Sequence, residues 1–383
     1  MLTNIKELLN PYGNVLSKPQ FSHFVGFVQG LSACEIPSLS RMSEIHCKSR
    51  SSMDRFLTES PWEISSLKTI YHNQIKSLVE NNSSLLIDDS ISHRPYARKV
   101  EKANFHYDHT TGKDSLGYSI VTSVISSNEE IIPYDLIPYY RKEDCDGKSF
   151  KTKNTFAVEI IDSTKNNPNI TEVIFDTWYS NEQVIGACKK AKKHYITQIK
   201  SNRNVTINQH KNAVRTFVKG IGEEEWEFTL HKNSTFRFFA TSAFISKIGS
   251  VHLIFCQKYH DKEKKWGDTH YLISDQLTTV SNILIQRYLN RVGIEGFHRD
   301  AKQNLGLEGY FLRKNRGIER YLFLVLLTYG LLVLQKHKTN VNFSIGELCE
   351  EQKTNVYKQT FEDIKRNPEI EKEKFKGLAR ARV

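Results

Sequence analysis

The sequence has few cysteines, and none of them has the spacing that metal-binding or disulfide-rich domains require. Six cysteines are scattered over 383 residues, and no two of them form a CxxC pair. This pattern argues against a zinc ribbon and a disulfide framework, and it is typical of proteins in a reduced cytoplasm. We therefore expect a cytoplasmic protein.

Export and membrane segments are also missing from the sequence. No positively charged region followed by an apolar stretch opens the chain, so a secretory signal is not expected. The longest apolar run, residues 321–334 (YLFLVLLTYGLLVL), is shorter than the roughly 20 residues that a helix needs to cross a bilayer. It predicts a buried helix and no membrane partner. The chain shows neither an internal repeat nor a low-complexity linker.

Acidic residues are outnumbered by basic ones. There are 54 lysine and arginine residues against 43 aspartate and glutamate residues, which gives a net charge of +11. Such an excess favours polyanionic partners through counterion release, although it says nothing about the fold. The length predicts two or three domains with a large core.

The pattern of apolar residues predicts an α/β unit that follows a helical start. Residues 1–80 are expected to be helical, and both a DNA-binding module and an ordinary scaffold remain open for them. From 81 to 203, segments rich in β-branched and aromatic residues alternate with amphipathic ones. Their order predicts three strands, a helix, a strand, a helix and a last strand, at residues 83–90, 117–127, 129–140, 153–167, 171–176, 181–193 and 195–200.

The second half of the chain contains three segments with different sequence patterns. Residues 204–276 predict an all-β insertion, because strand-like segments follow one another without helical periodicity. Residues 277–335 are expected to complete the α/β unit with helices. Residues 336–383 predict a basic helical C-terminal tail.

Three acidic residues occupy comparable points of this α/β unit. Asp88 and Asp176 end two of the predicted strands, and Glu295 lies on a later predicted helix. Two Mg²⁺ ions about 3.5–4 Å apart need hard oxygen ligands of this kind. Asp89 is an alternative to Asp88, because adjacent strand residues point to opposite faces. Structural roles also remain open: a turn for the Asp88–Asp89 pair and a helix cap for Asp176.

The segment 288–302 (YLNRVGIEGFHRDAK) predicts a helix with one polar face. At about 100° per residue, Tyr288, Arg291, Glu295 and Lys302 fall within an arc of roughly 60°. A carboxylate among cations suggests a metal site beside a polyanion, and a solvated face with an Arg291–Glu295 pair is the alternative. Two glycines flank Glu295, and a close approach of substrate would explain the missing side chains there.

These residues resemble a known group of enzymes. The spacing Y-x2-R-x3-E-x6-K from Tyr288 to Lys302 is similar to the signature of DDE transposases of bacterial insertion sequences, in the insertion-sequence-four family. The block LLIDDS resembles the first-aspartate strand of that family, and VIFDTWYSN resembles its second-aspartate block. The resemblance covers about residues 80 to 335.

The resemblance implies a fold and a metal site. The fold would be a ribonuclease H-like core, with a mixed five-stranded sheet, flanking helices and an all-β insertion, between helical N- and C-terminal parts. Asp88, Asp176 and Glu295 would bind two Mg²⁺ ions, for which Mn²⁺ would substitute. The resemblance further implies that Tyr288, Arg291 and Lys302 would hold phosphates of the transposon end.

The resemblance also implies further DNA contacts. In relatives an insertion tryptophan stacks on a flipped base, and Trp266 is the first candidate here, with Trp226 second. Apart from the resemblance, Lys200 and Arg203, after the last core strand, are candidate DNA contacts by their charge and position, and a solvated surface is the alternative. Five other polar residues near the acids are expected to have structural roles: His93, His106, His109, His298 and Asp300.

The implied function is cut-and-paste transposition by a bacterial, nucleoid-associated enzyme. Metal-activated water would cleave the element's ends, and the released 3′-hydroxyls would attack target DNA. The partners would be double-stranded DNA, at terminal inverted repeats and at the target, and a second subunit in a synaptic homodimer. A structure-selective nuclease on the same core and a non-catalytic DNA-binding relative remain alternatives.

Overall fold

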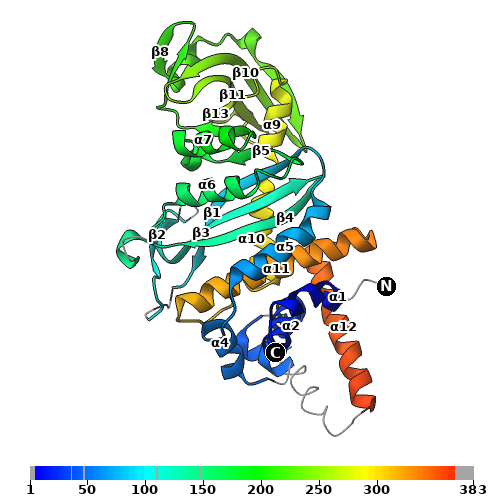
Figure 1. The fold of residues 1–383 in the computed structure, drawn as a ribbon. Helices are drawn as coiled ribbons and strands as arrows, with labels where there is room; N and C mark the ends of the chain where they lie inside the picture. Colours follow the sequence, from blue (N-terminus) through cyan, green and yellow to red (C-terminus); the bar gives the residue numbers. More distant parts are fainter. Residues whose placement is uncertain are drawn as a thin grey trace.

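One large mixed sheet forms the centre of the molecule (Figure 1). The computed structural model describes residues 5–366, apart from positions 36, 46–47, 96, 98, 109–110 and 146–148. Thirteen strands are hydrogen-bonded together within these residues. Their order is β2-β3-β1-β5-β6-β13-β11-β10-β7-β8, with β4, β9 and β12 paired to β3, β10 and β11.

Five of these strands form the part of the sheet that carries the acidic residues. β1 (Ser83–His93) pairs antiparallel with β3 (Lys113–Ser127), which pairs antiparallel with β4 (Glu130–Tyr139). On its other edge β1 pairs parallel with β5 (Ile170–Phe175), and β5 pairs parallel with β6 (His194–Ile199). The predicted mixed α/β architecture is confirmed, and this strand order is compatible with a ribonuclease H-like core.

Helices flank both faces of this region. α6 (Lys153–Ser163) begins after Thr152, whose hydroxyl accepts a hydrogen bond from the Thr155 amide. α7 (Glu182–Lys190) forms the crossover between β5 and β6, and Asn181 caps its start. α10 (Val292–Asn304) packs on β1, β3 and β4. These caps satisfy backbone N–H groups that a helix start leaves without partners, so the local sequence fixes where each helix begins.

The strands of the insertion continue the same sheet. β13 (His270–Ser274) pairs antiparallel with β6, and β11 (Gly249–His260) and β10 (Ser234–Ile245) follow outward from it. The sheet is therefore larger than the five strands predicted, because the open edge of β6 is covered by a strand that comes 71 positions later in the chain. The remaining short elements lie farther out: β7 (Asn204–Ile207), β8 (His210–Ala213), α8 (Val214–Phe217), β9 (Glu227–His231) and β12 (Lys265–Trp266).

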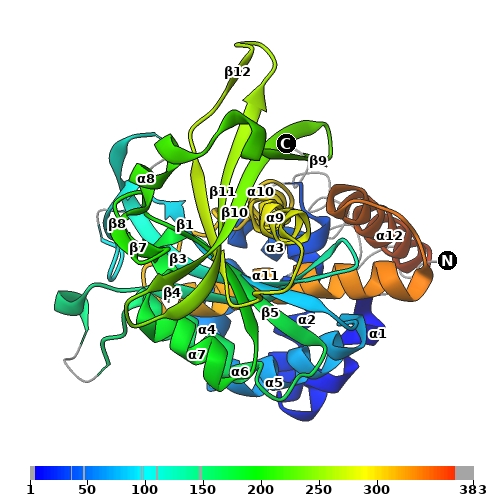
Figure 2. The same cartoon turned by 90° about the horizontal axis from the view of Figure 1, so that it is seen from above.

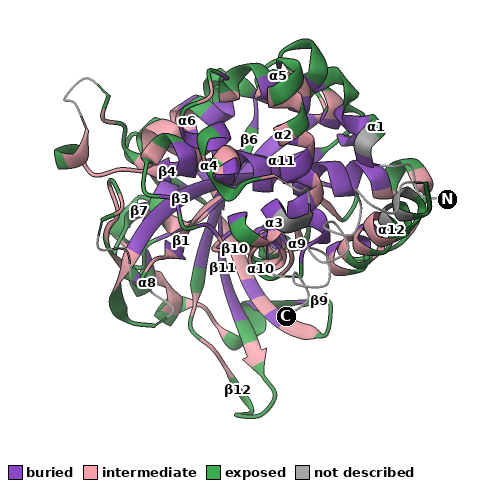
Figure 3. Cartoon of the chain, turned by 90° about the horizontal axis from the view of Figure 1, so that it is seen from below, coloured by how far each residue is buried: buried purple, intermediate pink, exposed green. Residues whose placement is uncertain are grey.

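α11 (Asn315–Thr339) is the central buried helix, and it is longer than the predicted run at 321–334. It packs on β4 and on the N-terminal helices, and Figure 3 shows it as buried along most of its length. By length and composition alone it would be long and apolar enough to cross a membrane, but 94% of its most apolar window is buried inside the fold. Its buried Arg320 donates hydrogen bonds to the carbonyls of Leu57 and Ser60, both at 2.9 Å.

The N-terminal helices share one hydrophobic core with the sheet through α11. α12 (Ile345–Arg366) is docked against α2, α10 and α11, so this part of the predicted tail is packed on the fold. Residues 367–383 lie outside the described residues. The predicted domain boundaries and a DNA-binding role for residues 1–80 remain predictions. The N-terminal helices are α1 (Ile5–Leu9), α2 (Lys18–Ala33), α3 (Leu39–Ile45), α4 (Arg50–Thr58) and α5 (Ile64–Ile75).

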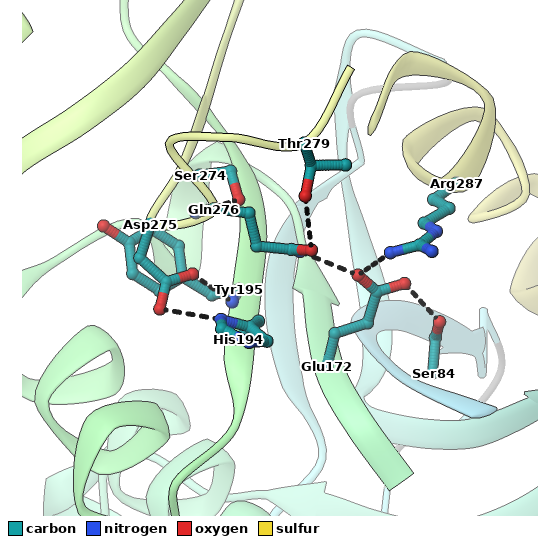
Figure 4. A network of polar contacts seen from close by, with 9 residues as sticks. All are labelled: Ser84, Glu172, His194, Tyr195, Ser274, Asp275, Gln276, Thr279 and Arg287. Atoms are coloured by element: carbon teal, nitrogen blue, oxygen red, sulfur yellow. Dashed lines mark hydrogen bonds and ion pairs between the residues drawn. The ribbon is translucent and has the colours of Figure 1, made fainter. Parts of the chain in front are cut away.

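A buried carboxylate ties the end of the insertion to the core (Figure 4). Glu172 on β5 is 2% exposed and accepts hydrogen bonds from the Ser84 hydroxyl on β1, at 2.6 Å, and from the Gln276 amide, at 3.2 Å. It also pairs with Arg287 on α9 (Ser281–Leu289), at 3.4 Å. The adjacent Asp275 accepts a hydrogen bond from the Tyr195 amide of β6. These contacts fix where the chain leaves the insertion and how α9 sits on the sheet.

Candidate active site

Asp88 and Asp176 lie on neighbouring parallel strands. The β1–β5 ladder ends at the pair Ile87 and Phe175, and the two aspartates are the next residues of each chain segment. The prediction that Asp88 ends a strand was wrong, because β1 continues to His93 along its antiparallel partner β3. Asp176 does follow its strand, and its carboxylate accepts a hydrogen bond from the Trp178 amide at 3.0 Å. The expected capping role of Asp176 is therefore present alongside its place beside Asp88.

The two adjacent aspartates of β1 face opposite sides of the sheet. Asp88 is paired with Thr122 of β3, whose hydroxyl is 2.8 Å from His298 Nε2 on α10. Asp89 instead accepts a hydrogen bond from Lys153 of α6, at 2.6 Å. Because the side chains of a strand alternate between its faces, only Asp88 points to the side that carries α10.

Burial and mutual repulsion shift the pKa values of the aspartates upward. Burial, followed by the charges of Asp176 and Asp89, raises the pKa of Asp88 to about 6, although Arg291 opposes the shift. Burial and the charge of Asp89 also raise the pKa of Asp176. Carboxylates held together in this way favour a cation that neutralises them, which is the electrostatic condition for a divalent metal site.

The segment 288–302 does not form the single helix that was predicted. α9 ends at Leu289 and α10 begins at Val292, with a tight turn at Asn290 and Arg291 between them. In this turn the amide of Arg291 donates to the Tyr288 carbonyl, and the amide of Ile294 donates to the Arg291 carbonyl. Because the helix is broken at this turn, Tyr288 lies on α9, Arg291 lies in the turn, and Glu295 and Lys302 lie on α10.

Three of the four signature residues are nevertheless neighbours. The Arg291 guanidinium donates a hydrogen bond to the Asp88 carboxylate and lies 4.0 Å from Glu295 Oε1. The Tyr288 ring centroid is 5.9 Å from the guanidinium carbon. Burial raises the pKa of Tyr288 to about 12, so its hydroxyl stays protonated and available as a donor. Lys302 lies on α10 next to the later part of β1, where its ammonium is 3.1 Å from Glu308 and 3.3 Å from the Ile91 carbonyl.

The third acid is not assembled with the two aspartates. The Glu295 side chain is 61% exposed, and the Arg291 guanidinium lies between it and Asp88. Across the described positions no group of three histidine, cysteine, aspartate or glutamate side chains could hold a metal ion. Asp88 and Asp176 offer the hard oxygen donors that Mg²⁺ prefers, whereas Glu295 would join them only after Arg291 moves. The expected alternative, an Arg291–Glu295 surface pair, is thus also part of the geometry.

The glycines beside Glu295 have different surroundings. A β-carbon on Gly293 would lie 2.4 Å from the end of the Ile131 side chain on β4, so a larger residue at this position would require Ile131 to shift. The expectation that an approaching substrate explains the missing side chain stays a prediction. At Gly296 a β-carbon would meet only Arg299, at 3.8 Å, and the space around this glycine is open.

The candidate tryptophans of the insertion pack against one arginine. Trp226 is 6% exposed, so it belongs to the core of the insertion. Trp266 is half-buried on β12, in the hairpin that extends away from the sheet in Figure 2. The Arg237 guanidinium lies 4.5 Å from the Trp226 ring and 4.8 Å from the Trp266 ring. Burial leaves Trp226 without a free face, whereas Trp266 keeps part of its surface exposed.

The minor candidates near the acids have structural partners. Burial lowers the pKa values of His298 and His106 to about 4, so both rings are neutral at pH 7. His93 Nδ1 is 2.7 Å from the Ser115 hydroxyl. Asp300 pairs with Arg299 at 3.7 Å. His109 lies outside the described residues.

Lys200 and Arg203 line a cavity that the sequence did not predict. The cavity measures about 800 Å³ and lies between the end of β5, the β6–β7 connection and the β10–β11 turn. Its wall includes Trp178, two residues after Asp176, with a side chain that is 58% exposed. The block DTWYSN shows a tryptophan close to an acid. Only the structure shows that this tryptophan is exposed and that lysines from the insertion line the same cavity.

The sequence matches a known family over most of its length. Residues 65–346 match the family model DDE_Tnp_2, whose description reads "Archaeal putative transposase ISC1217". No curated protein is significantly similar to the chain. The matched segment contains all three acidic residues Asp88, Asp176 and Glu295, and it includes the whole insertion. The chain belongs to this family of DDE transposases of insertion sequences.

Proposed function

We propose that this protein performs cut-and-paste transposition, in which it cleaves the ends of its element and joins them to target DNA. The observation that carries the proposal is the placement of Asp88 beside Asp176, under the turn that presents Arg291. Carboxylates with raised pKa values next to a guanidinium suit the handling of phosphodiesters. Membership of a DDE transposase family supports the same reaction class.

Asp88, Asp176 and Glu295 are the proposed metal ligands, with Asp88 favoured over Asp89 because it faces α10. Two Mg²⁺ ions, or Mn²⁺ in their place, would activate the attacking water or 3′-hydroxyl and stabilise the leaving oxygen. Glu295 sits one turn of helix after Arg291, so a change of the Arg291 rotamer would free both acids at once.

Arg291, Tyr288 and Lys302 are the proposed phosphate contacts. The planar fork of Arg291 suits two oxygens of one phosphate, and it would exchange the Asp88 carboxylate for that phosphate. The Tyr288 hydroxyl, kept protonated by its raised pKa, would donate a hydrogen bond and not act as a nucleophile. The Lys302 ammonium, which lies beside Ile91 of β1, would add a positive charge for another phosphate.

Further contacts and a partner complete the proposal. Lys200 and the exposed part of Trp266 would also contact DNA, and the excess of basic residues favours such binding. Because the element has two ends, the active form would be a synaptic homodimer on terminal inverted repeats and target DNA. A bacterial, nucleoid-associated setting in the insertion-sequence-four branch remains part of this proposal.

Cleavage of the DNA that flanks the gene tests this function. A labelled duplex that carries the flanking inverted repeat should be cut at the repeat boundary only when Mg²⁺ or Mn²⁺ is present. Glu295→Gln should lower the rate by at least about 100-fold, because it removes a metal-stabilised charge. Glu263→Gln is the matched control: Glu263 is 58% exposed and paired with Lys265, as Glu295 is 61% exposed and paired with Arg291. If Glu295→Gln cleaves as fast as this control, the metal site is wrong.

A further inference from the structure

The cavity beside Asp176 is lined by several basic residues. Four of its lining residues are basic, namely Lys200, Arg203, Lys211 and Lys247, and none of the described residues in its wall is acidic. Lys247 is paired with Glu182 at 3.3 Å. The other three form no ion pair within the described part of the chain and are exposed to solvent. Three uncompensated cations around one concave surface attract a polyanion.

The backbone that carries these cations is held in place. The Arg203 amide donates to the Lys200 carbonyl at 2.9 Å, which closes the turn after β6. The Val214 amide donates to the Arg203 carbonyl at 2.8 Å, and the Arg215 amide donates to the Ser201 carbonyl at 3.1 Å. The turn is thus tied to the segment that follows β8. A surface ordered before binding loses less entropy when a ligand arrives.

Two aromatic side chains face solvent at the same cavity. Trp178 is 58% exposed and Phe244 is 53% exposed, and both line the wall. Trp178 comes from the turn after β5, and Phe244 comes from β10 of the insertion. Exposed rings interleaved with cations are the combination that binds distorted or unpaired nucleotides, by stacking on bases while the cations hold phosphates.

The cavity and the signature residues of α10 lie on opposite sides of the two aspartates. Along the sheet, α10 packs on β4, β3 and β1, whereas the cavity borders β5, β6, β7 and β10. Asp88 on β1 and Asp176 on β5 stand between them. No described residue of α9 or α10 lines the cavity. The two aspartates are therefore flanked by the basic cavity on one side and, on the other, by α10 with Arg291 and Lys302, which are paired with Asp88 and Glu308.

We propose that this cavity binds the target DNA strand, while Arg291 and Lys302 hold the transposon end. Lys200, Arg203 and Lys211 would contact phosphates of the target, and Trp178 and Phe244 would stack on bases exposed where the target bends. The inference rests on the proposed function, because only strand transfer brings a second DNA to the same carboxylates. The target DNA would then lie on the cavity side of the aspartates, and the transposon end would lie on the α10 side.

The chemistry requires two strands to meet at Asp88 and Asp176. The 3′-oxygen of the transposon end attacks a target phosphorus, and a new P–O bond forms as its proton passes to solvent. The bond from that phosphorus to the target's own 3′-oxygen breaks, and this oxygen takes up a proton. One phosphodiester replaces another, so no oxidant, reductant or further reactant is needed. The attacking and leaving oxygens lie on opposite sides of the phosphorus. In the same way, the cavity and the α10 side lie on opposite sides of the two aspartates.

Binding of two DNAs tests the assignment without requiring catalysis. One DNA is a linear duplex of the transposon end, and the other is a branched duplex in which that end is already joined to target DNA. The double variant Arg203→Ala/Lys211→Ala should bind the branched DNA about tenfold more weakly and leave the linear DNA unchanged. Its salt dependence should fall by about two units of slope for the branched DNA only, one for each lost phosphate contact. Lys219→Ala is the control, an exposed lysine of the insertion outside the cavity wall.

Catalysis then separates the two proposals. With a pre-cleaved end and a plasmid target, the double variant should lose about tenfold in strand transfer but cleave an intact end at the parental rate. A parallel loss of both activities, or of affinity for both DNAs, would mean that the cavity holds the transposon end. Unchanged affinity for the branched DNA would also overturn the assignment. Absence of cleavage by the parent protein would instead refute the proposed function, whichever DNA the cavity prefers.

Discussion

Asp88 and Asp89 are consecutive residues of β1, yet their carboxylates are bound by arginine and lysine side chains on opposite faces of the sheet. Asp88 accepts a hydrogen bond from Arg291 at the start of α10, and Asp89 accepts one from Lys153 of α6. The backbone amide of Asp89 also donates to Asp88 Oδ1, at 2.9 Å. This backbone contact orients the Asp88 carboxylate, and the charge of Asp89 adds to the burial that raises the pKa values of Asp88 and Asp176.

Asparagine substitutions should separate the two residues. Asp88→Asn should abolish measurable Mn²⁺ binding and lower cleavage by at least about 100-fold, because it removes a carboxylate ligand. Asp89→Asn should keep Mn²⁺ binding within a few-fold, since its side chain faces α6. Titration of Mn²⁺ followed by electron paramagnetic resonance measures the affinity directly. Loss of Mn²⁺ binding in Asp89→Asn but not in Asp88→Asn would reverse the assignment.

Replacing Arg291 should have opposite effects on the two ligands. Arg291→Ala removes a cation that competes for Asp88, so we expect tighter Mn²⁺ binding to the protein without DNA. The same change removes a proposed phosphate contact, and the salt slope of end binding should therefore fall by about 1. Calorimetry with Mn²⁺ and fluorescence anisotropy with labelled DNA measure the two effects.

Arg299→Ala is a suitable control for Arg291→Ala, because Arg299 lies on α10, which begins directly after Arg291, and its side chain is 67% exposed. It should change neither Mn²⁺ affinity nor the salt slope. Weaker Mn²⁺ binding in Arg291→Ala would show that the guanidinium supports the carboxylate geometry and does not compete with the metal.

Local patterns in the sequence were enough to predict the strands that bury apolar residues. β3 and β5 are runs of β-branched residues, and both were predicted close to their observed positions. β2 (Asn104–Asp108) was missed, because it is short and its two apolar residues, Phe105 and Tyr107, lie on an exposed face. Its pairing with β3 is a tertiary contact that a local pattern does not contain.

The candidate site was predictable in composition but not in geometry. The spacing of Tyr288, Arg291 and Glu295 singled out candidate residues, whose roles stay predictions, but the break between α9 and α10 was not predicted. Asn290 and Arg291 both have ordinary helical backbone angles, so no proline or left-handed residue marks the turn. The contact between Arg291 and Asp88 spans 203 positions, and no one-dimensional pattern encodes it.

Glu172 should contribute strongly to stability. Glu172→Ala would leave the buried Ser84 hydroxyl and the half-buried Gln276 amide without their acceptor, at a cost of about 2–4 kcal/mol in the free energy of unfolding. Arg287→Ala should cost less, about 1 kcal/mol or below, since the Arg287 side chain is 40% exposed and its pairing is screened by solvent. Urea denaturation followed by circular dichroism measures both. An equal cost for the two variants would mean that the ion pair, and not the hydrogen bonds, holds the network together.

His298 should make the protein less stable in mild acid. Burial lowers its pKa to about 4 in the folded protein, against 6.5 for an ordinary histidine, so the unfolded chain binds the extra proton more readily. The stability that comes from the neutral ring is fully present above about pH 6.5 and is lost as the pH falls toward 4. Between pH 7 and pH 5 this loss amounts to about 2 kcal/mol.

Comparison with His298→Gln isolates this effect. Glutamine keeps a donor near the Thr122 hydroxyl but does not titrate, so the variant should lose about 2 kcal/mol less than the parent between pH 7 and pH 5. Asp88, whose raised pKa of about 6 gives the opposite slope in this range, is present in both proteins and cancels in the difference. Urea midpoints at several pH values provide the measurement. Parallel stability curves for parent and variant would show that His298 is charged, or exposed to water, in the folded state.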